Sequence, residues 1–206
     1  MLFRSAVMLI KAYDLPLGLQ ILLAGCVGGA LGLAVGLLTL RLRGIFFSIA
    51  TVAITIIIET VIINWRFVGG ATGVQILRPP VLPPFESYTK MLFVCAVIMA
   101  IIAVAIARYI ETSWIGRGLR AIRDNEEAAE CMGVPTLKLK LLACVISGAL
   151  MSAAGAPLAM YQSFVEPASA FNLTYSVSAL AMPIIGGTSH WLGPVIGAIL
   201  LGAVQQ

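Results

Sequence analysis

Residues on which catalysis and metal binding depend are scarce in this chain. Histidine occurs once among the 206 residues, so a histidine-based metal cluster cannot be built from the chain. The four cysteines show no CxxC spacing. No phosphate-binding loop of the form GxxxxGK[ST] occurs, so any nucleotide hydrolysis must take place on another chain. We therefore expect no catalytic residue, no metal site and no cofactor in this chain.

Isolated polar and sulfur-containing residues have plain structural interpretations. His190 stands in a turn beside Trp191, where we expect a polar cap at a membrane interface. Three of the cysteines, Cys26, Cys95 and Cys144, fall within apolar stretches. We expect these three to be small, buried, apolar side chains.

Charged residues are rare as well. They make up 11% of the chain, against 60% hydrophobic residues, and the mean hydropathy is +1.03. Soluble domains carry about 25% charged residues. This composition predicts an all-α fold, a polytopic transmembrane helix bundle of five to six spans, in one domain over residues 1–206. The net charge of +4 does not indicate a nucleic-acid partner, because the basic residues flank apolar runs.

Four apolar stretches are long enough to cross a hydrocarbon core, which requires roughly 20 residues. They cover residues 17–40, 44–63, 91–110 and 141–161. Two shorter apolar pieces follow, at 176–185 and 192–204, separated by GGTSHW. We interpret these as two spans joined by a tight turn, and the alternative is a re-entrant hairpin.

Basic residues predict the orientation of the spans. If the charged loop 111–140 is cytoplasmic, the turn at 41–43 is cytoplasmic too and residues 64–90 lie outside. The inside segments then hold eight of the 13 Lys and Arg residues and the outside segments hold five, as the positive-inside rule requires. Trp65, Trp114 and Trp191 fall at predicted span ends, where tryptophan anchors a helix at the interface.

The only long charged stretch, residues 114–140, contains signals for a short helix. The segment from Asp124 to Glu127 has the form of a capping box, in which Asp124 accepts from the backbone N–H of Glu127 and Glu127 reaches back. Gly133 suits the left-handed position that follows a helix, and Pro135 blocks any continuation. We predict a helix over 125–132 that can press against a partner as a rigid lever.

Glu59 is an ionisable residue inside a predicted span, which makes it a functional candidate. Thr51, Thr55 and Glu59 are spaced by four, so they share one helix face. That face either lines a polar path for a substrate or packs against another helix. In a further interpretation, Glu59 reaches the outer interface or pairs with Arg66.

Glycine is concentrated in the first span. Gly25–Gly29 and Gly28–Gly32 are GxxxG pairs, and Gly36 continues the same pattern. Such spacing allows the backbones of neighbouring membrane helices to approach closely. We expect this contact within the bundle or at a subunit interface.

Four stretches of the chain, in order, resemble permease subunits of branched-chain amino acid ABC importers, the LivM-like group. They are LRLRGIFFSIATVAI, NWRFVGGATGV, GRGLRAIRDNEEAAECMGVPTLKLKLLACVISGALMSAAGA and MPIIGGTSHWLGPVIGAILLG, and the resemblance covers residues 17–202. In the third stretch, Glu127, Ala128 and Ala129 are followed by three residues and Gly133. This pattern is similar to the EAA loop motif of bacterial importer permeases, which is weak alone but specific in this order of spans.

The resemblance implies a multi-pass protein of the bacterial plasma (inner) membrane that acts as a permease subunit and not as an enzyme. The implied partners are ABC ATPase subunits, which use ATP, a second permease subunit, an extracytoplasmic substrate-binding protein and membrane lipid. In such permeases the charged loop docks into a cleft on the ATPase. The residues expected to couple to it are Arg120, Arg123, Asp124, Glu126, Glu127, Ala128, Ala129 and Gly133.

The resemblance also implies that spans are missing. Family members usually carry further spans before the first one here, so we expect truncation at both ends. The expected substrates are branched-chain or other amino acids. The alternatives are a urea or short-chain amide ABC permease, whose motifs are closely similar, and an ATP-independent channel or facilitator, which would leave the capped helix without a purpose. A membrane-embedded enzyme would need paired ionisable residues in its spans, where Glu59 is the only clear one.

Overall fold

The part of the protein that the structure describes is helical apart from one short pair of strands. The structure, a computed structural model, describes residues 17–40, 42, 45–65, 74–75, 87–162, 164–165, 171, 173–187 and 191–204. The described elements are α2 (Leu17–Thr39), α3 (Ile45–Asn64), β1 (Val74–Gln75), α4 (Tyr88–Thr112), α5 (Trp114–Asp124), α6 (Glu126–Cys131), α7 (Thr136–Gln162), β2 (Phe164–Val165), α9 (Leu173–Gly186) and α10 (Gly193–Val204). The expected all-α class is confirmed.

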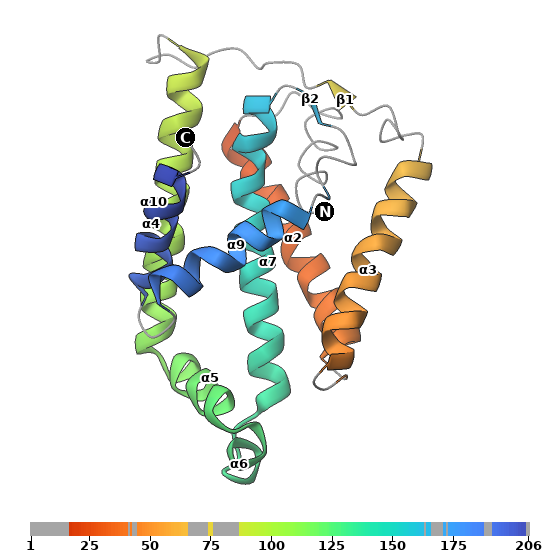
Figure 1. The fold of residues 1–206 in the computed structure, drawn as a ribbon, viewed down its shortest axis with the longest axis vertical. Coiled ribbons are helices and arrows are strands. Elements are labelled where there is room, and N and C mark those ends of the chain that lie inside the picture. Colours follow the sequence, from red (N-terminus) through yellow and green to blue (C-terminus); the bar gives the residue numbers. More distant parts are fainter. Residues whose placement is uncertain are drawn as a thin grey trace.

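Four long helices run alternately up and down the long axis of the molecule. In Figure 1, α2 descends, α3 ascends, α4 descends and α7 ascends. The helices α5 and α6 lie at the lower end, which is also where α2 passes into α3. The antiparallel pair of β1 and β2 lies at the upper end. The α2–α3 turn therefore lies on the same side of the molecule as the α5–α6 loop, as the orientation argument requires, although Arg41 and Arg43 lie outside the described residues.

The long helices match the predicted spans. Gly18–Thr39, Tyr88–Thr112 and Thr136–Gln162 are long and apolar enough to cross a membrane, and α3 adds 20 apolar residues between the first two. The helix α7 begins at Thr136 rather than at the predicted residue 141. The reason is that Pro135 ends the preceding loop, and a helix can start directly after it. The polytopic membrane bundle is confirmed.

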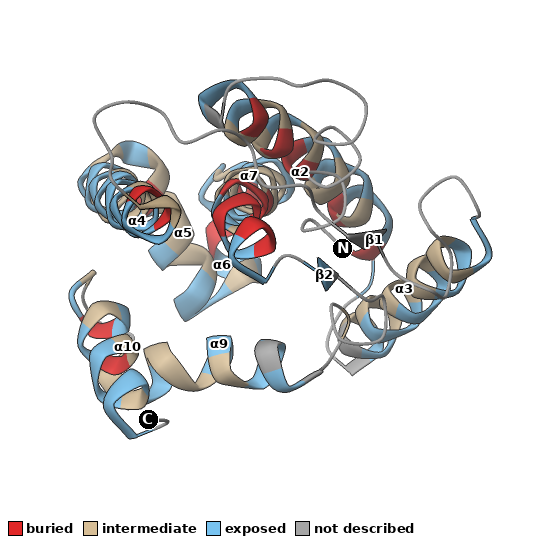
Figure 2. Ribbon diagram, turned by 90° about the horizontal axis from the view of Figure 1, so that it is seen from above, coloured by how far each residue is buried: buried red, intermediate tan, exposed pale blue. Residues whose placement is uncertain are grey.

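Apolar side chains cover the outside of these helices. Leu22, Phe46 and Ile101 are each more than 60% exposed within the chain, a cost that water would impose and lipid does not. Cys26 is exposed as well, so its expected burial is wrong. It lies on the outer face of α2, away from the face that packs. Figure 2 shows that buried residues are concentrated on α2 and α7.

The core of the bundle is the contact between α2 and α7. A methyl group built on Gly28 would lie 2.6 Å from the carbonyl oxygen of Gly148, and one built on Gly32 would lie 2.6 Å from that of Cys144. Ser152, also in this contact, is fully buried. The two backbones therefore touch, and the predicted glycine packing is confirmed as a contact within the bundle.

The last two helices form a hairpin. They have 14 and 12 residues, and Gly187, with φ +92°, begins the turn between them. A methyl group built on Gly197 would meet the carbonyl oxygen of Met182, so these helices also touch backbone to backbone. The two predicted apolar pieces are confirmed as helices, but both are shorter than the roughly 20 residues of a full span, and residues 188–190 of the predicted turn lie outside the described residues. The predicted cap at His190 lies outside the described residues.

Candidate functional site

The charged loop begins with a sharp elbow between α4 and α5. Ser113 ends α4 and begins α5 in an extended conformation, and its hydroxyl accepts from the backbone N–H of Gly116 at 3.5 Å. A methyl group built on Gly116 would lie 2.8 Å from the carbonyl oxygen of Glu111. Only glycine fits this approach, so the elbow aims α5 away from the axis of α4 (Figure 1).

The helix α5 was not predicted as a separate element, although it forms half of the loop. Its arginines recur at every third position, at Arg117, Arg120 and Arg123, and all three are exposed. Arg120 pairs with Glu111 at 3.1 Å, and Arg123 pairs with its neighbour Asp124 at 3.5 Å. These exposed ion pairs contribute little stability. Residues 111–140 carry five basic and five acidic side chains, so this end of the molecule presents charges of both signs.

The cap of α6 differs from the predicted capping box. The helix α5 continues to Asp124, so Asp124 is helical and cannot act as an N-cap. The cap is Asn125, which is extended (φ −159°, ψ 113°) and whose side chain accepts from the N–H of Ala128 at 3.1 Å. The predicted bond from Glu127 to Asp124 is therefore wrong by one residue, and α6 spans Glu126–Cys131.

The end of α6 agrees with the prediction. Gly133 has φ +81°, in the left-handed region that glycine adopts without strain. Its N–H donates to the carbonyl of Glu130 at 2.9 Å, and the N–H of Val134 donates to that of Ala129 at 3.0 Å. These two bonds define a Schellman motif. The helix α6 is therefore closed at both ends.

The side chains of α6 divide into an inward and an outward set. Ala129 is 4% exposed and packs within the chain, whereas Glu127 and Ala128 are exposed. Glu126 pairs with Lys140 of α7, and Glu130 accepts from the hydroxyl of Thr136. Within the described part of the chain, Glu127 makes no ion pair. The exposed surface of α6 thus includes Glu127, Ala128 and Cys131, and Met132 continues it.

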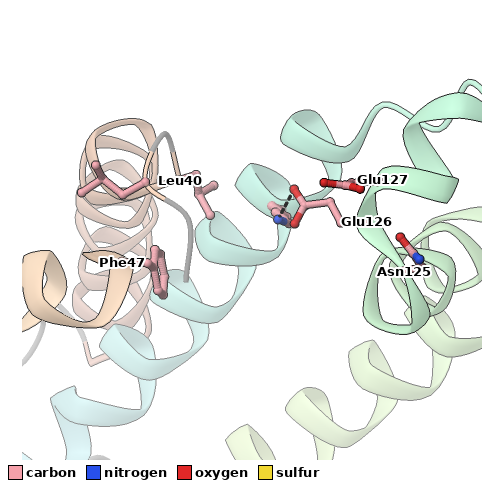
Figure 3. A pocket seen from close by; sticks show the side chains of 7 residues that line it. Leu40, Phe47, Asn125, Glu126 and Glu127 are labelled. Atoms are coloured by element: carbon pink, nitrogen blue, oxygen red, sulfur yellow. Dashed lines mark ion pairs between the residues drawn. The ribbon is translucent and has the colours of Figure 1, made fainter. Parts of the chain in front are cut away.

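An open groove of about 510 Å³ runs beside α6. One wall is apolar and consists of Leu40, Leu42 and Phe47, from the end of α2 and the start of α3. The other wall is polar and contains Asn125, Glu126, Glu127 and Lys140. Figure 3 shows Leu40 and Phe47 on one side and Asn125, Glu126 and Glu127 on the other, with the Glu126 ion pair on the polar side. The groove can hold a segment that presents apolar and polar groups side by side.

The residues predicted to line a substrate path lie within α3. Thr51, Thr55 and Glu59 are half-buried, like Ile54 and Ile58, whereas residues on the opposite side of α3 are exposed. The hydroxyl of Thr55 donates to the carbonyl of Thr51 at 2.9 Å. Glu59 forms no hydrogen bond or ion pair among the described residues. The three residues share the inward face of α3, as predicted, while Arg66 lies outside the described residues.

Sequence reasoning missed several residues that shape the loop. Lys140 and Thr136 fasten α6, and Leu40 and Phe47 form the apolar wall. The spacing of Glu126 to Glu130 and of Thr136 to Lys140, four in each case, was a signal for two facing pairs. The orientation argument placed the α2–α3 turn on the same side as the charged loop, but nothing in the sequence indicated that this turn and α6 would line one groove.

The fold is that of a multi-pass membrane protein with a capped helix between two spans. Residues 3–206 match the family described as branched-chain amino acid transport system / permease component, and the chain belongs to that family. The chain is 27% identical, over 87% of its length, to the high-affinity branched-chain amino acid transport system permease protein LivM of Salmonella typhimurium, and it covers 48% of that relative.

Other relatives are permeases for sugars. The ribose import permease protein RbsC of Haemophilus influenzae is 30% identical over 51% of this chain and 34% of its own length. The L-arabinose transport system permease protein AraH of Escherichia coli is 32% identical over 44% of this chain and 29% of its own length. The chain spans about half of LivM, 48%. No solved structure shows significant similarity to the chain.

Proposed function

We propose that this chain is a permease subunit of an ATP-driven importer in a bacterial inner membrane, with α6 as the contact for an ATPase subunit. The observation that carries this function is the position of α6. It is a short, doubly capped helix at one end of a bundle of apolar spans, with Glu127 and Ala128 exposed. In a membrane protein of this family, such a helix has water and a soluble partner as its surroundings.

The groove beside α6 supplies a second contact surface for the same partner. Its apolar wall at Leu40 and Phe47 and its polar wall at Glu127 suit a protein segment in which apolar and basic side chains adjoin. The ATPase subunit then touches both the α5–α6 loop and the α2–α3 turn. Arg120, Arg123 and Asp124 lie on α5 beside this surface and add charged contacts at its rim. ATP is bound and used by the partner.

Amino acids are the proposed substrates. The LivM protein of Salmonella typhimurium, a branched-chain amino acid permease, is matched over 87% of this chain, whereas the sugar permeases RbsC and AraH are matched over about half of it. This difference supports amino acids over sugars. A substrate-binding protein delivers the substrate to the end of the molecule that carries β1 and β2, and a second permease subunit completes the pathway through the membrane.

Cross-linking tests the contact between α6 and the ATPase. In a background without the four native cysteines, Ala128→Cys in the assembled transporter should cross-link to an ATP-binding subunit. Trp65→Cys is the matched control, because Trp65 is exposed and directly follows α3 (Ile45–Asn64), which runs away from the end of the molecule that carries α6 (Figure 1). Equal cross-linking from both positions, or none from Ala128→Cys, would contradict the proposal. Genes for two P-loop ATPases and a secreted binding protein beside this reading frame would support it independently.

A further inference from the structure

Two side-chain contacts join α6 to the first turns of α7. Lys140 Nζ lies 2.5 Å from Glu126 Oε1, and Thr136 Oγ1 donates to Glu130 Oε1 at 2.7 Å. Glu126 and Glu130 are four residues apart on α6, and Thr136 and Lys140 are four apart on α7, so each pair shares one helix face. The contacts run in antiparallel register. We call these four residues the clasp.

The connection between α6 and α7 is short and is fixed by hydrogen bonds. Only residues 132–135 connect α6 to α7, and Gly133 and Val134 return two hydrogen bonds to α6. On the other side, a methyl group built on Gly118 of α5 would lie 2.5 Å from Leu139 Cδ1, and Leu139 is buried. The segment from α5 to the first turns of α7 is therefore closely packed.

We propose that the clasp makes α6 and α7 a single lever, so that a displacement of α6 is carried into α7 instead of being absorbed by the connection. This inference rests on the proposed function, because an ATPase subunit supplies the displacement. Glu126 and Lys140 also line the groove beside α6, but their charges pair with each other, so we assign them a positioning role and leave the ATPase contact to Glu127 and the apolar wall. Since α7 touches α2 backbone to backbone, α2 is the next helix to move.

The surroundings of the clasp suit this role. Thr136 is 5% exposed and Glu130 is exposed, so the hydrogen bond between them is partly buried. The Lys140 and Glu126 side chains are 28% and 37% exposed, so water and salt weaken their attraction. The hydrogen bond holds the end of α6 that leads into α7, and the ion pair holds the other end. High ionic strength should loosen the ion pair first, because salt screens the attraction between two charges.

Charge exchange in the assembled transporter tests the clasp. Glu126→Lys and Lys140→Glu should each lower the amount of substrate imported per ATP hydrolysed several-fold, while the ATPase subunits remain bound and active. The double exchange, Glu126→Lys with Lys140→Glu, should restore most of the ratio, because it recreates the ion pair with reversed polarity. Lys138→Glu is the matched control, since Lys138 is exposed on the same turn of α7 and lies outside the clasp. It should leave the ratio unchanged.

A second pair of variants keeps the test decisive if the charge reversals do not fold. Thr136→Val removes the partly buried hydrogen bond without changing charge and should lower the ratio, and Thr136→Ser should retain it. If the double exchange does not restore the amount of substrate imported per ATP hydrolysed, the proposed role of the clasp is wrong. Loss of the ATPase subunits from either single variant would also overturn it, because Glu126 or Lys140 would then be a direct contact. Absence of ATPase from the unmodified transporter would instead refute the proposed function itself.

Discussion

Two neighbouring apolar helices, α2 and α3, pack in opposite ways. The face of α2 that carries Gly28 and Gly32 lies directly on the backbone of α7. The helix α3 has no glycine within IFFSIATVAITIIIETVIIN, and its β-branched and aromatic side chains keep other backbones at a distance. Figure 2 shows α3 standing apart from the packed helices when the molecule is seen from above. Both helices are apolar, so the glycines on one face of α2 are what allow close packing against α7.

This difference separates two mechanical roles. The α2–α7 pair behaves as a unit because its backbones interlock, and α6 is attached to the lower end of that unit by the clasp. The helix α3 can change its position at less cost, since few of its side chains leave close contacts when it moves. In the proposed importer, the α2–α7 pair transmits the displacement, and α3 presents the inward face that carries Thr51, Thr55 and Glu59.

The largest effect should follow from adding one methyl group to the α2–α7 contact. Gly32→Ala places a carbon 2.6 Å from the carbonyl oxygen of Cys144, so the helices must separate. We expect a loss of about 1–3 kcal/mol in the free energy of unfolding, measured by denaturation in detergent micelles. Gly29→Ala is the matched control, because its nearest neighbours lie at 3.6 Å, an ordinary contact. Equal stability of both variants would show that the α2–α7 pair is not closely packed.

A smaller effect should follow from changing the end of α6. At Gly133, with φ +81°, a β-branched residue costs about 1–2 kcal/mol. Gly133→Val should therefore distort the turn that joins α6 to the α2–α7 pair and uncouple ATP hydrolysis from uptake. Gly133→Asn serves as control, because asparagine tolerates the left-handed region. Both variants are compared by the ratio of substrate imported to ATP hydrolysed, and an unchanged ratio in Gly133→Val would exclude this role.

A substitution on the inward face of α3 should change the rate of transport and leave the assembly of the transporter unchanged. Glu59→Gln removes one charge from the half-buried face of α3 and should lower the uptake rate several-fold, because an ionisable group inside a span is costly unless it is used. The yield and stability of the assembled transporter should stay unchanged. Thr60→Val is a suitable control, because Thr60 lies on the exposed side of the same helix. Normal uptake by Glu59→Gln would assign the residue an interfacial role instead.

The sequence allowed the spans to be predicted but not their partners. Length and hydropathy mark α2, α4 and α7 because lipid imposes both. The glycine pattern indicated a close contact on α2, yet which helix fills it depends on the whole arrangement. The missed helix α5 contains Gly116 and Gly118, and glycine lowers helix propensity. Asp124 and Asn125 are equally good N-caps, and the extent of α5 decides between them.

The smallest effect should come from the contact that ties the terminal hairpin to α4. The guanidinium carbon of Arg108 lies 5.5 Å from the centroid of the Trp191 ring, within the range of a cation–π interaction, which contributes about 0.5–1 kcal/mol at exposed sites. Arg108→Gln should therefore lower the stability in detergent by no more than this amount. Arg108→Lys, which keeps the charge, should lose less than Arg108→Gln. A loss as large as that of Gly32→Ala would mean that the hairpin belongs to the same rigid unit as α2 and α7, and the contrast between held and movable helices would then apply to α3 alone.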